Sequence, residues 1–449
     1  MSDNLQELSK KAAKIILSCP KEAKIRIISH YDADGITAAA IMSQALHRAG
    51  YNFHATLMRN PFIQGLERVK KEGNELIIFT DMGSGQIEFI EQMGCKVIII
   101  DHHQYVKEKT NADILQINAN LCGINGNYEA CGATLSYSVA KALDSNNVDL
   151  VSLAMAGATG DKQYIGGIRG YNKEVLKEAL ENGVLEKKVD MKLNGSTIAD
   201  ALYYSIEPYY SGISGNKKGI SDLLKKLEID GSKKLEDIDE IKRKKLRSFL
   251  LFKLIKKGCE KNILDTVIRD RYYPNNLPFE LESFADILDS GGKGGNRGLA
   301  LSVCFGDEES LKAAINLEKS YKQEVLDELL RLEKEDTLDK KAFRYFYSRG
   351  SSLGGVIAGI AANFIFDNKK PLISLIKKDN EIHISCRGNQ ELVKKGLDLG
   401  LVMKEVAKTL DGNGGGHAIA SGATINIEKE QEFLEKIDEI ISSQLEGQL

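Results

Sequence analysis

The stretch Lys24-Ile-Arg-Ile-Ile-Ser-His-Tyr-Asp-Ala-Asp-Gly35 decides the fold class of this chain. Residues 24–28 form a short apolar run, as a buried strand does, and residues 36–49 are rich in Ala, Leu and Met. Gly50 then ends the helical pattern, which is the usual place for a glycine after a helix. A strand, a polar turn and a helix make up the unit from which open α/β sheets are built.

The same alternation continues to about residue 185. Continuous apolar runs at residues 75–80 and 96–100 predict strands that are buried on both faces of a parallel sheet. Helical patterns lie between and after these runs, at residues 62–71, 85–93 and 129–143. We therefore predict an α/β fold with an N-terminal, open, mostly parallel sheet and flanking helices.

The length of 449 residues suits two or three domains, and the pattern divides the chain into four segments. Residues 1–190 form the N-terminal α/β domain, and residues 191–310 are predicted to be a charged helical insertion and a return segment. Residues 311–340 have the pattern of a long connector helix. Residues 341–449 are predicted to form a smaller α/β domain with a glycine-rich loop near residues 412–416.

The composition is that of a globular protein, with 42% apolar and 28% charged residues. No run approaches the roughly 18 consecutive apolar residues of a membrane helix, so we expect no membrane partner. The seven cysteines are odd in number and contain no C-x-x-C pair. This pattern favours reduced thiols in the cytoplasm over a disulfide framework or a zinc site.

The net charge of −3 taken alone argues mildly against a nucleic-acid-binding protein, in which a basic excess is usual. The charge is uneven along the chain, however, because residues 216–273 contain 17 Lys and Arg against 10 Asp and Glu. This basic segment is either the solvated face of a helical insertion or a docking surface for a polyanion or an acidic protein.

Acidic and histidine residues occur at four points where predicted strands or helices end. They are His30-Tyr-Asp-Ala-Asp34 after the first strand, Asp81 after the second, Asp101-His-His103 after the third, and Gly160-Asp161 after a helical run. Ligands of open α/β sheets gather outside the carboxyl ends of the strands. We therefore expect these four segments to converge in one crevice.

The converging side chains indicate metal ions. They are five carboxylates and three imidazoles, namely Asp32, Asp34, Asp81, Asp101, Asp161, His30, His102 and His103. Neighbouring carboxylates repel one another and have raised pKa values unless cations lie among them. Carboxylate and imidazole ligands without thiolate suit Mn²⁺, Mg²⁺ or Fe²⁺. Two such ions about 3.5–4 Å apart would activate a water and clamp the oxygens of an in-line phosphoryl displacement.

Other sites with similar motifs are disfavoured. A calcium EF-hand with Gly35 at its sixth position would need a glutamate at position 41, where the chain has Ile41. Asp32-Ala-Asp-Gly-Ile-Thr37 also resembles the nucleophilic motif of haloacid-dehalogenase-type phosphatases. The residues after Asp161 lack the second aspartate of those enzymes, and the Asp-His-His cluster would remain unexplained. The sequence contains no P-loop.

The N-terminal motifs resemble those of the DHH phosphoesterase family: Ile28-Ser-His-Tyr-Asp-Ala-Asp-Gly-Ile-Thr37, Asp81, Asp101-His-His103 and Gly160-Asp161. This family includes RecJ-type exonucleases, oligonucleotide and cyclic-dinucleotide phosphodiesterases, and family II pyrophosphatases. The resemblance implies a two-metal site whose ligands are His30, Asp32, Asp34, Asp81, His102 and Asp161. It implies that Asp81 bridges the ions, that His103 faces the scissile phosphate, and that Asp101 orients a histidine.

The C-terminal segment resembles the domain associated with DHH domains. Gly414-Gly-Gly-His-Ala-Ile-Ala-Ser-Gly422 is similar to its GGGH signature, and Ser385-Cys-Arg387 is similar to its S-x-R strand. Glycines let backbone amides approach a phosphate, and Arg or His adds charge-assisted hydrogen bonds. The expected phosphate-binding residues are Arg387, Gly414, Gly415, Gly416 and His417. Lys293 and Arg297, among five glycines between 291 and 298, either bind further phosphates or lie in a surface loop.

The length, the insertion and the stretch Asp286–Gly298 resemble archaeal RecJ-like proteins of the GINS-associated nuclease type. The resemblance implies an exonuclease that uses two divalent metal ions, with Mn²⁺ preferred and Mg²⁺ second, to hydrolyse single-stranded DNA or RNA to mononucleotides in replication or repair. The alternatives are a phosphodiesterase or phosphatase for short oligonucleotides or small nucleotides, and a replisome scaffold that binds the GINS complex.

Overall fold

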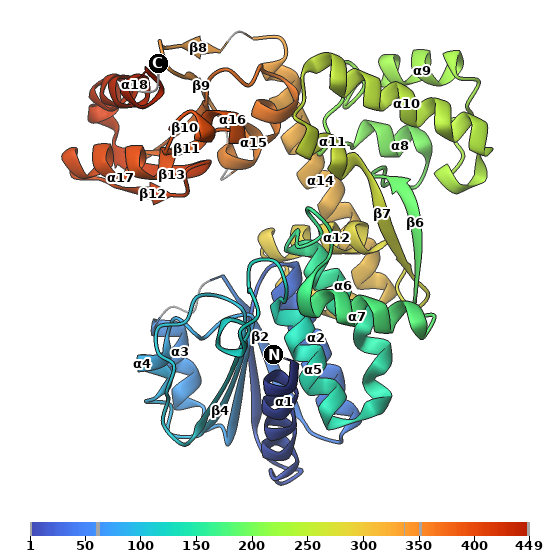
Figure 1. Cartoon of the computed structure of the whole chain (residues 1–449), viewed down its shortest axis with the longest axis vertical. Coiled ribbons are helices and arrows are strands. Elements are labelled where there is room, and N and C mark those ends of the chain that lie inside the picture. Colours follow the sequence, from blue (N-terminus) through green and yellow to red (C-terminus); the bar gives the residue numbers. More distant parts are fainter. Residues whose placement is uncertain (1, 60–62, 336, 350–352, 447–449) are drawn as a thin grey trace. The chain divides into compact units, whose positions relative to one another are not determined.

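The structure, a computed structural model, describes residues 2–59, 63–335, 337–349 and 353–446. The chain folds into two compact units (Figure 1). Unit 1 consists of Met1–Asp190 and Asp270–Glu318, and unit 2 consists of Met191–Arg269 and Lys319–Leu449. The chain passes between the units three times, within β6 (Leu185–Met191), β7 (Ile268–Pro274) and α14 (Glu308–Leu332).

A five-stranded parallel sheet forms the centre of unit 1. Its strands, in spatial order, are β2 (Phe53–Met58), β1 (Ile25–His30), β3 (Leu76–Thr80), β4 (Lys96–Asp101) and β5 (Ile114–Asn118). All four neighbouring pairs are parallel. β2 lies on one side of β1 and the later strands on the other, so the order in which strands are added to the sheet reverses at β1 and β3. Open α/β sheets bind their ligands at such a switch point.

Helices cover both faces of this sheet (Figure 1). On one face lie α1 (Ser2–Leu17), α2 (Ala33–Arg48), α5 (Gly132–Leu143) and α6 (Val151–Gly160). On the other lie α3 (Ile63–Lys71) and α4 (Ile87–Ile90). Alternate residues of β3 supply the two cores, since Ile78 faces the first set of helices and Ile77 the second. Unit 1 also contains α7 (Gly170–Glu181), α12 (Leu281–Lys293) and α13 (Arg297–Val303).

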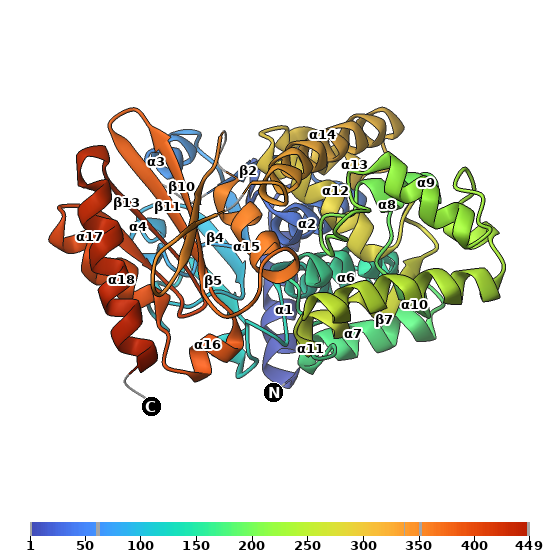
Figure 2. The ribbon, with the colours of Figure 1, turned by 90° about the horizontal axis from the view of Figure 1, so that it is seen from above.

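A six-stranded sheet organises the C-terminal part of unit 2. Its strands, in spatial order, are β12 (Asn413–Gly416), β13 (Ala420–Asn426), β11 (Glu381–Arg387), β10 (Leu372–Lys378), β9 (Arg344–Tyr347) and β8 (Leu338–Asp339). Figure 2 shows α17 (Leu399–Thr409) and α18 (Glu430–Glu446) on one face and α15 (Gly354–Phe364) on the other. A short helix, α16 (Gln390–Lys394), follows β11.

The basic segment belongs to unit 2. It contains α9 (Lys217–Lys226), α10 (Glu240–Lys257) and α11 (Lys261–Val267), preceded by α8 (Ile198–Tyr203). Leu250 of α10, Leu329 of α14 and Phe364 of α15 belong to one buried cluster, so the helical segment and the C-terminal sheet share a core. Among the described residues, none of the helices combines the length and apolar character that crossing a bilayer requires.

The structure confirms the predicted fold class and corrects three local predictions. No strand is predicted between residues 190 and 275, but β6 and β7 pair there at its two ends. These strands are polar, and four of the seven residues of β6 are exposed, so they lack the apolar run of a buried strand. The predicted glycine-rich loop near residues 412–416 contains β12, and the predicted connector helix ends at Leu332.

Candidate metal centre

Three neighbouring strands of unit 1 end in candidate ligands at one edge of the sheet. β1 ends at His30, Asp81 directly follows β3, and β4 ends at Asp101. The amide of Asp81 donates to the carbonyl oxygen of Ile100 (2.8 Å), which brings the end of β3 alongside β4. The parallel topology therefore places these side chains together at the point where the strand order reverses.

The candidate ligand atoms form three overlapping groups, and within each group all atoms lie within 4.8 Å of one another. The groups are His30, Asp32 and Asp81; Asp34, His102 and Asp161; and Asp81, His102 and His103. Asp81 belongs to two groups and is 2% exposed. A carboxylate shared in this way can hold two cations side by side.

Two buried atoms at the centre have no hydrogen-bond partner among the described residues. Nδ1 of His30 lies 2.7 Å from Oδ2 of Asp32, and Oδ1 of Asp81 lies 3.1 Å from Nε2 of His102, contacts that are ion pairs only when the imidazoles are protonated. Polar atoms that are buried, close together and unsatisfied require an ion or water to complete them. The donor set of carboxylates and imidazoles fits divalent cations.

Burial and mutual repulsion disfavour ionisation of several carboxylates. Burial, together with the charge of Asp81, raises the pKa of Asp34, and burial together with the charge of Asp34 raises the pKa of Asp161. Burial also acts to raise the pKa of Asp81, but His102 and His30 outweigh it and lower that pKa. Cations at the centre would stabilise all three carboxylates in their ionised form.

His102 is held in one orientation by the backbone. Its Nδ1 makes a hydrogen bond with the carbonyl oxygen of Gly126 (2.6 Å), so that ring nitrogen is the donor and Nε2 is available as a ligand. Nε2 lies 3.1 Å from Asp81, 3.4 Å from Asp161 and 3.7 Å from Asp34. Backbone hydrogen bonds of this kind fix the tautomer and ring orientation of metal-binding histidines.

Asp101 orients the second histidine of the pair. Its buried Oδ1 accepts hydrogen bonds from Nδ1 of His103 (2.8 Å) and from the amides of His102 (2.8 Å) and His103 (3.1 Å), while Oδ2 accepts the amide of Ser84 (3.0 Å). The Asp101 hydrogen bond raises the pKa of His103. The side chain of His103 is 55% exposed, so a substrate can reach the imidazole.

Asp34 is held by the N-terminus of α5. The amides of Gly132 and Ala133 donate to Oδ2 (2.6 Å) and Oδ1 (2.9 Å) of its carboxylate. A Cβ on Gly132 would lie 2.5 Å from the Cβ of Asp81, and one on Gly157 would lie 2.6 Å from Oδ1 of Asp34. The motifs do not predict a role for these glycines, because backbone amides and missing side chains leave no chemical signature in a sequence.

Lys293 and Arg297 lie in unit 1, near the segment His30–Asp34 that carries the first candidate ligands. Nζ of Lys293 is 2.5 Å from Oδ2 of Asp289. The guanidinium of Arg297 lies over the ring of Tyr31, 5.7 Å from its centre, and Nη1 donates to the carbonyl oxygen of Leu57 (3.4 Å). The structure therefore places both cations next to the loop that carries candidate ligands, and pairs Lys293 with a carboxylate.

The remaining predicted residues lie in unit 2. Arg387 is opposite Ala420 on β13, and Gly416 is opposite Ser421 on the same strand, so Arg387 and the glycines of β12 are near the same end of the sheet. His417 is exposed in the turn after β12. This group is part of unit 2, whereas the candidate metal ligands all belong to unit 1.

Arg387 is partly buried without an acidic partner in the described part of the chain. Its Nη1 donates to the carbonyl oxygen of Cys386 (2.9 Å), and burial lowers the pKa of the guanidinium. A Cβ on Gly355 of α15 would lie 2.9 Å from Nη2, so the glycine leaves room for the guanidinium against the helix. An unpaired, partly buried guanidinium is suited to bind an anion.

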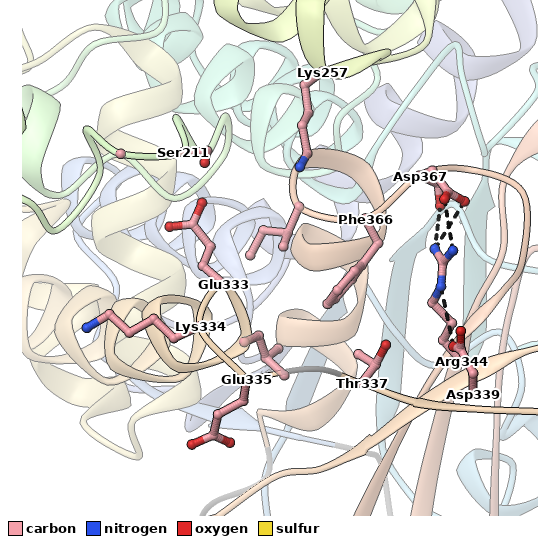
Figure 3. Close-up of a pocket in the computed structure, with 13 residues that line it drawn as sticks. Ser211, Lys257, Glu333, Lys334, Glu335, Thr337, Asp339, Arg344, Phe366 and Asp367 are labelled. Carbon is pink, nitrogen blue, oxygen red and sulfur yellow. Dashed lines mark hydrogen bonds and ion pairs between the residues drawn. The ribbon is translucent and has the colours of Figure 1, made fainter.

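A cavity of about 750 Å³ lies elsewhere in unit 2, between α10, the end of α14 and β9 (Figure 3). Lys257, Glu333 and Phe366 border it, and Arg344 at its edge forms an ion pair with Asp367 (2.8 Å). None of the predicted metal-binding or phosphate-binding residues lines this cavity.

Comparisons with known proteins identify the family. Residues 24–159 match the N-terminal domain of the DHH family, residues 169–322 match archaeal Cdc45, and residues 343–443 match the DHHA1 domain. An uncharacterized protein of Methanocaldococcus jannaschii is 33% identical over 428 residues, which cover 94% of each chain. The chain belongs to the DHH family.

The solved structures similar to this DHH protein have the same fold. RecJ of Thermus thermophilus in complex with Mn²⁺ superimposes with a TM-score of 0.58 at 16% identity, over 97% of this chain and 55% of that chain. Cdc45 of Entamoeba histolytica gives 0.62 at 14% identity, over 98% of each chain. The single-stranded-DNA-specific exonuclease RecJ of Bacillus subtilis is 26% identical over 212 residues, 44% of this chain and 26% of that protein. The DHH protein therefore has the predicted RecJ-like phosphoesterase fold.

Gly132→Ala tests the packing of the metal centre. The new Cβ would displace Asp81 and the hydrogen bonds to Asp34, so we expect Mn²⁺ affinity, measured by titration calorimetry, to fall by about 10-fold or more. Gly298→Ala is the matched control, because a Cβ there meets no atom within 4 Å. Equal Mn²⁺ affinity for both folded variants would contradict the arrangement described.

Proposed function

We propose that this DHH protein is a metal-dependent exonuclease that hydrolyses phosphodiester bonds of single-stranded DNA or RNA to mononucleotides. The observation that carries the proposal is the meeting of three overlapping ligand groups, linked through Asp81 and His102, at the switch point of the parallel sheet. Two divalent cations held there would supply Lewis acidity and make a water nucleophilic near neutral pH. Mn²⁺ is the proposed ion and Mg²⁺ the second; the structures of Thermus thermophilus RecJ in complex with each of these ions support a divalent cation in this fold.

The side chains of unit 1 have two proposed roles, metal binding and contact with the scissile phosphate. His30 and Asp32 would hold one ion, and Asp34, His102 and Asp161 the other. Asp81, which lies next to His30 and 3.1 Å from Nε2 of His102, would hold both. His103, oriented by its hydrogen bond to Asp101, would donate a hydrogen bond to the scissile phosphate or a proton to the leaving oxygen. The hydrogen bond of His103 to Asp101 raises the pKa of the imidazole, which favours the form that donates.

Phosphates along the strand would be bound by cations and amides outside the ligand groups. Arg387 and His417, with the backbone of Gly414, Gly415 and Gly416, are the proposed clamp of unit 2. Lys293 and Arg297 beside the first motif are the proposed contacts in unit 1. The proposed sites contain point charges and planar guanidinium groups, which recognise phosphates without reading the base sequence.

Short oligonucleotides or small nucleotides are the alternative substrates, since the same two-metal chemistry would cleave them. A length series of end-labelled strands separates the two classes. An exonuclease shortens strands of 20 or more nucleotides stepwise, about as readily as short ones, whereas a small-substrate phosphodiesterase acts only on strands of a few nucleotides.

A replisome role is favoured by the match of residues 169–322 to archaeal Cdc45 and by the surface of α10. Ile241, Phe252 and Ile255 of this helix are 69%, 60% and 53% exposed, and the surrounding segment carries the basic excess. Exposed apolar side chains among basic ones suit an acidic partner protein, and GINS is the proposed partner. This role is compatible with the nuclease activity.

Strands labelled at the 5′ or the 3′ end, in DNA and RNA form and with Mn²⁺ or Mg²⁺, test the nuclease directly. We expect the wild-type protein to release labelled mononucleotides from one end. Asp81→Ala should abolish turnover, because it removes the carboxylate that two of the ligand groups among the described residues share. A folded Asp81→Ala protein with a near-normal rate would contradict the two-metal proposal.

Arg387→Ala tests the phosphate clamp. In an Asp81→Ala background, which leaves the strand intact, we expect the affinity for a labelled single strand to fall by about 10-fold, as loss of a charge-assisted hydrogen bond predicts. Lys394→Ala removes a charge from an exposed ion pair in the same unit and serves as the control. Anisotropy titrations that give the same affinity for both variants would refute the clamp.

Phe252→Ser with Ile255→Ser tests the partner surface. We expect affinity for purified GINS to fall at least 10-fold, measured by calorimetry, while exonuclease rates stay unchanged. Val189→Ser, at an equally exposed apolar residue on β6, is the control. No binding of GINS by the wild-type protein would reject this partner.

A further inference from the structure

The last turn of α12 contacts the first residue of α2, within the segment His30–Asp34 that carries candidate ligands. Oδ1 of Asp289 accepts a hydrogen bond from the amide of Ala33 (2.7 Å), although the two residues are 256 positions apart. Ala33 stands between Asp32 and Asp34, which belong to different ligand groups. A contact at Ala33 therefore acts on both carboxylates through one stretch of backbone.

Asp289 completes the N-terminus of α2. The first amides of a helix have no partner within the helix, and carboxylates near them are favoured by the helix dipole. Asp32, at the N-cap, accepts the amide of Gly35 with its Oδ1 (3.1 Å), while its Oδ2 lies 2.7 Å from His30. Without Asp289, the amide of Ala33 would have to donate its hydrogen bond to solvent.

Close packing holds the same loop from two helices. A Cβ on Gly292 of α12 would lie 1.8 Å from the carbonyl oxygen of Tyr31, and one on Gly160 of α6 would lie 2.6 Å from the Cβ of Ala33. The loop therefore has little room to move toward either helix. The hydrogen bond of Asp289 adds a directional contact to this packing.

Lys293 keeps Asp289 in place. Its Nζ lies 2.5 Å from Oδ2 of Asp289, one helical turn away, so the oxygen that does not accept from Ala33 is neutralised. Asp289 is absent from the ligand groups found among the described residues. A neutralised carboxylate can support the metal centre without adding another unpaired negative charge.

We propose that Asp289, held by Lys293, is a positioning residue of the metal centre. It aligns the backbone between Asp32 and Asp34 so that both carboxylates stand in place before cations bind. The inference rests on the proposed metal-dependent function, and it gives the Asp286–Gly298 stretch a task besides phosphate binding. Preorganisation of this kind raises metal affinity because binding then orders fewer groups.

Asp289→Ala and Asp289→Asn, made in the full-length protein, test the proposal. We expect Asp289→Ala to weaken Mn²⁺ binding by about 10-fold in calorimetry. The metal-free variant should also exchange amide hydrogens faster in the peptide that contains residues 29–36. Asp289→Asn should stay within about threefold of the wild type, because its side-chain oxygen can still accept from Ala33.

Asp149→Ala is the matched control. It breaks an ion pair with Arg48 (2.7 Å) at the opposite end of α2, so it removes a comparable contact from the same helix. We expect it to change neither Mn²⁺ affinity nor exchange in residues 29–36. If Asp289→Ala does not fold, Lys293→Met, which removes the ion pair of Asp289, should speed amide exchange in residues 29–36 of the metal-free protein, and unchanged exchange there would contradict the proposal.

Two results would overturn the positioning role: wild-type Mn²⁺ affinity in folded Asp289→Ala, or an equal loss of affinity in Asp149→Ala. The strand-digestion assay reports on the proposed function separately. A wild-type protein that binds Mn²⁺ but digests no strand would reject the exonuclease and leave the role of Asp289 to be decided by the affinities. A wild-type protein that binds no Mn²⁺ would overturn both.

Discussion

The carboxylates of Asp34, Asp81 and Asp161 surround one imidazole, that of His102, in the interior of unit 1. These carboxylates repel one another, and the surrounding parts of unit 1 must offset that repulsion for the unit to fold. The start of α5 directs two backbone amides at Asp34, which counters the repulsion without introducing a cation that would compete with metal binding. His102, turned by Gly126, supplies the remaining compensation.

Each of these groups comes from a different element, so the site depends on the packing of the whole unit. Asp34 is on α2, Asp81 follows β3, and Asp161 follows α6. Glycines at the contacts between α5, α6 and α2 allow the helices to approach closely enough for their polar groups to meet. A single methyl group added at Gly157 would contact the carboxylate of Asp34 directly.

The sequence predicts the parts of this arrangement that have a chemical signature. The apolar runs of β1, β3 and β4 and the Asp and His residues after them are visible because burial and charge select particular residue types. β2 and β5 escape prediction because His54 and Gln116 interrupt their apolar character. Contacts made through backbone atoms, such as that of Gly126 with His102, have no counterpart in residue type. Asp289 is visible as an acid, but only the fold shows that it meets Ala33.

The discontinuity of unit 1 has a consequence for its biosynthesis. The ribosome completes the loop around Ala33 long before it makes α12, since 256 positions separate Ala33 from Asp289. At about 5–20 residues per second, the delay is on the order of 10–50 s. During this interval the nascent sheet can form while its ligand loop still lacks the contact from α12. The emerging chain would thus complete its fold only after the whole of residues 191–269 has left the exit tunnel.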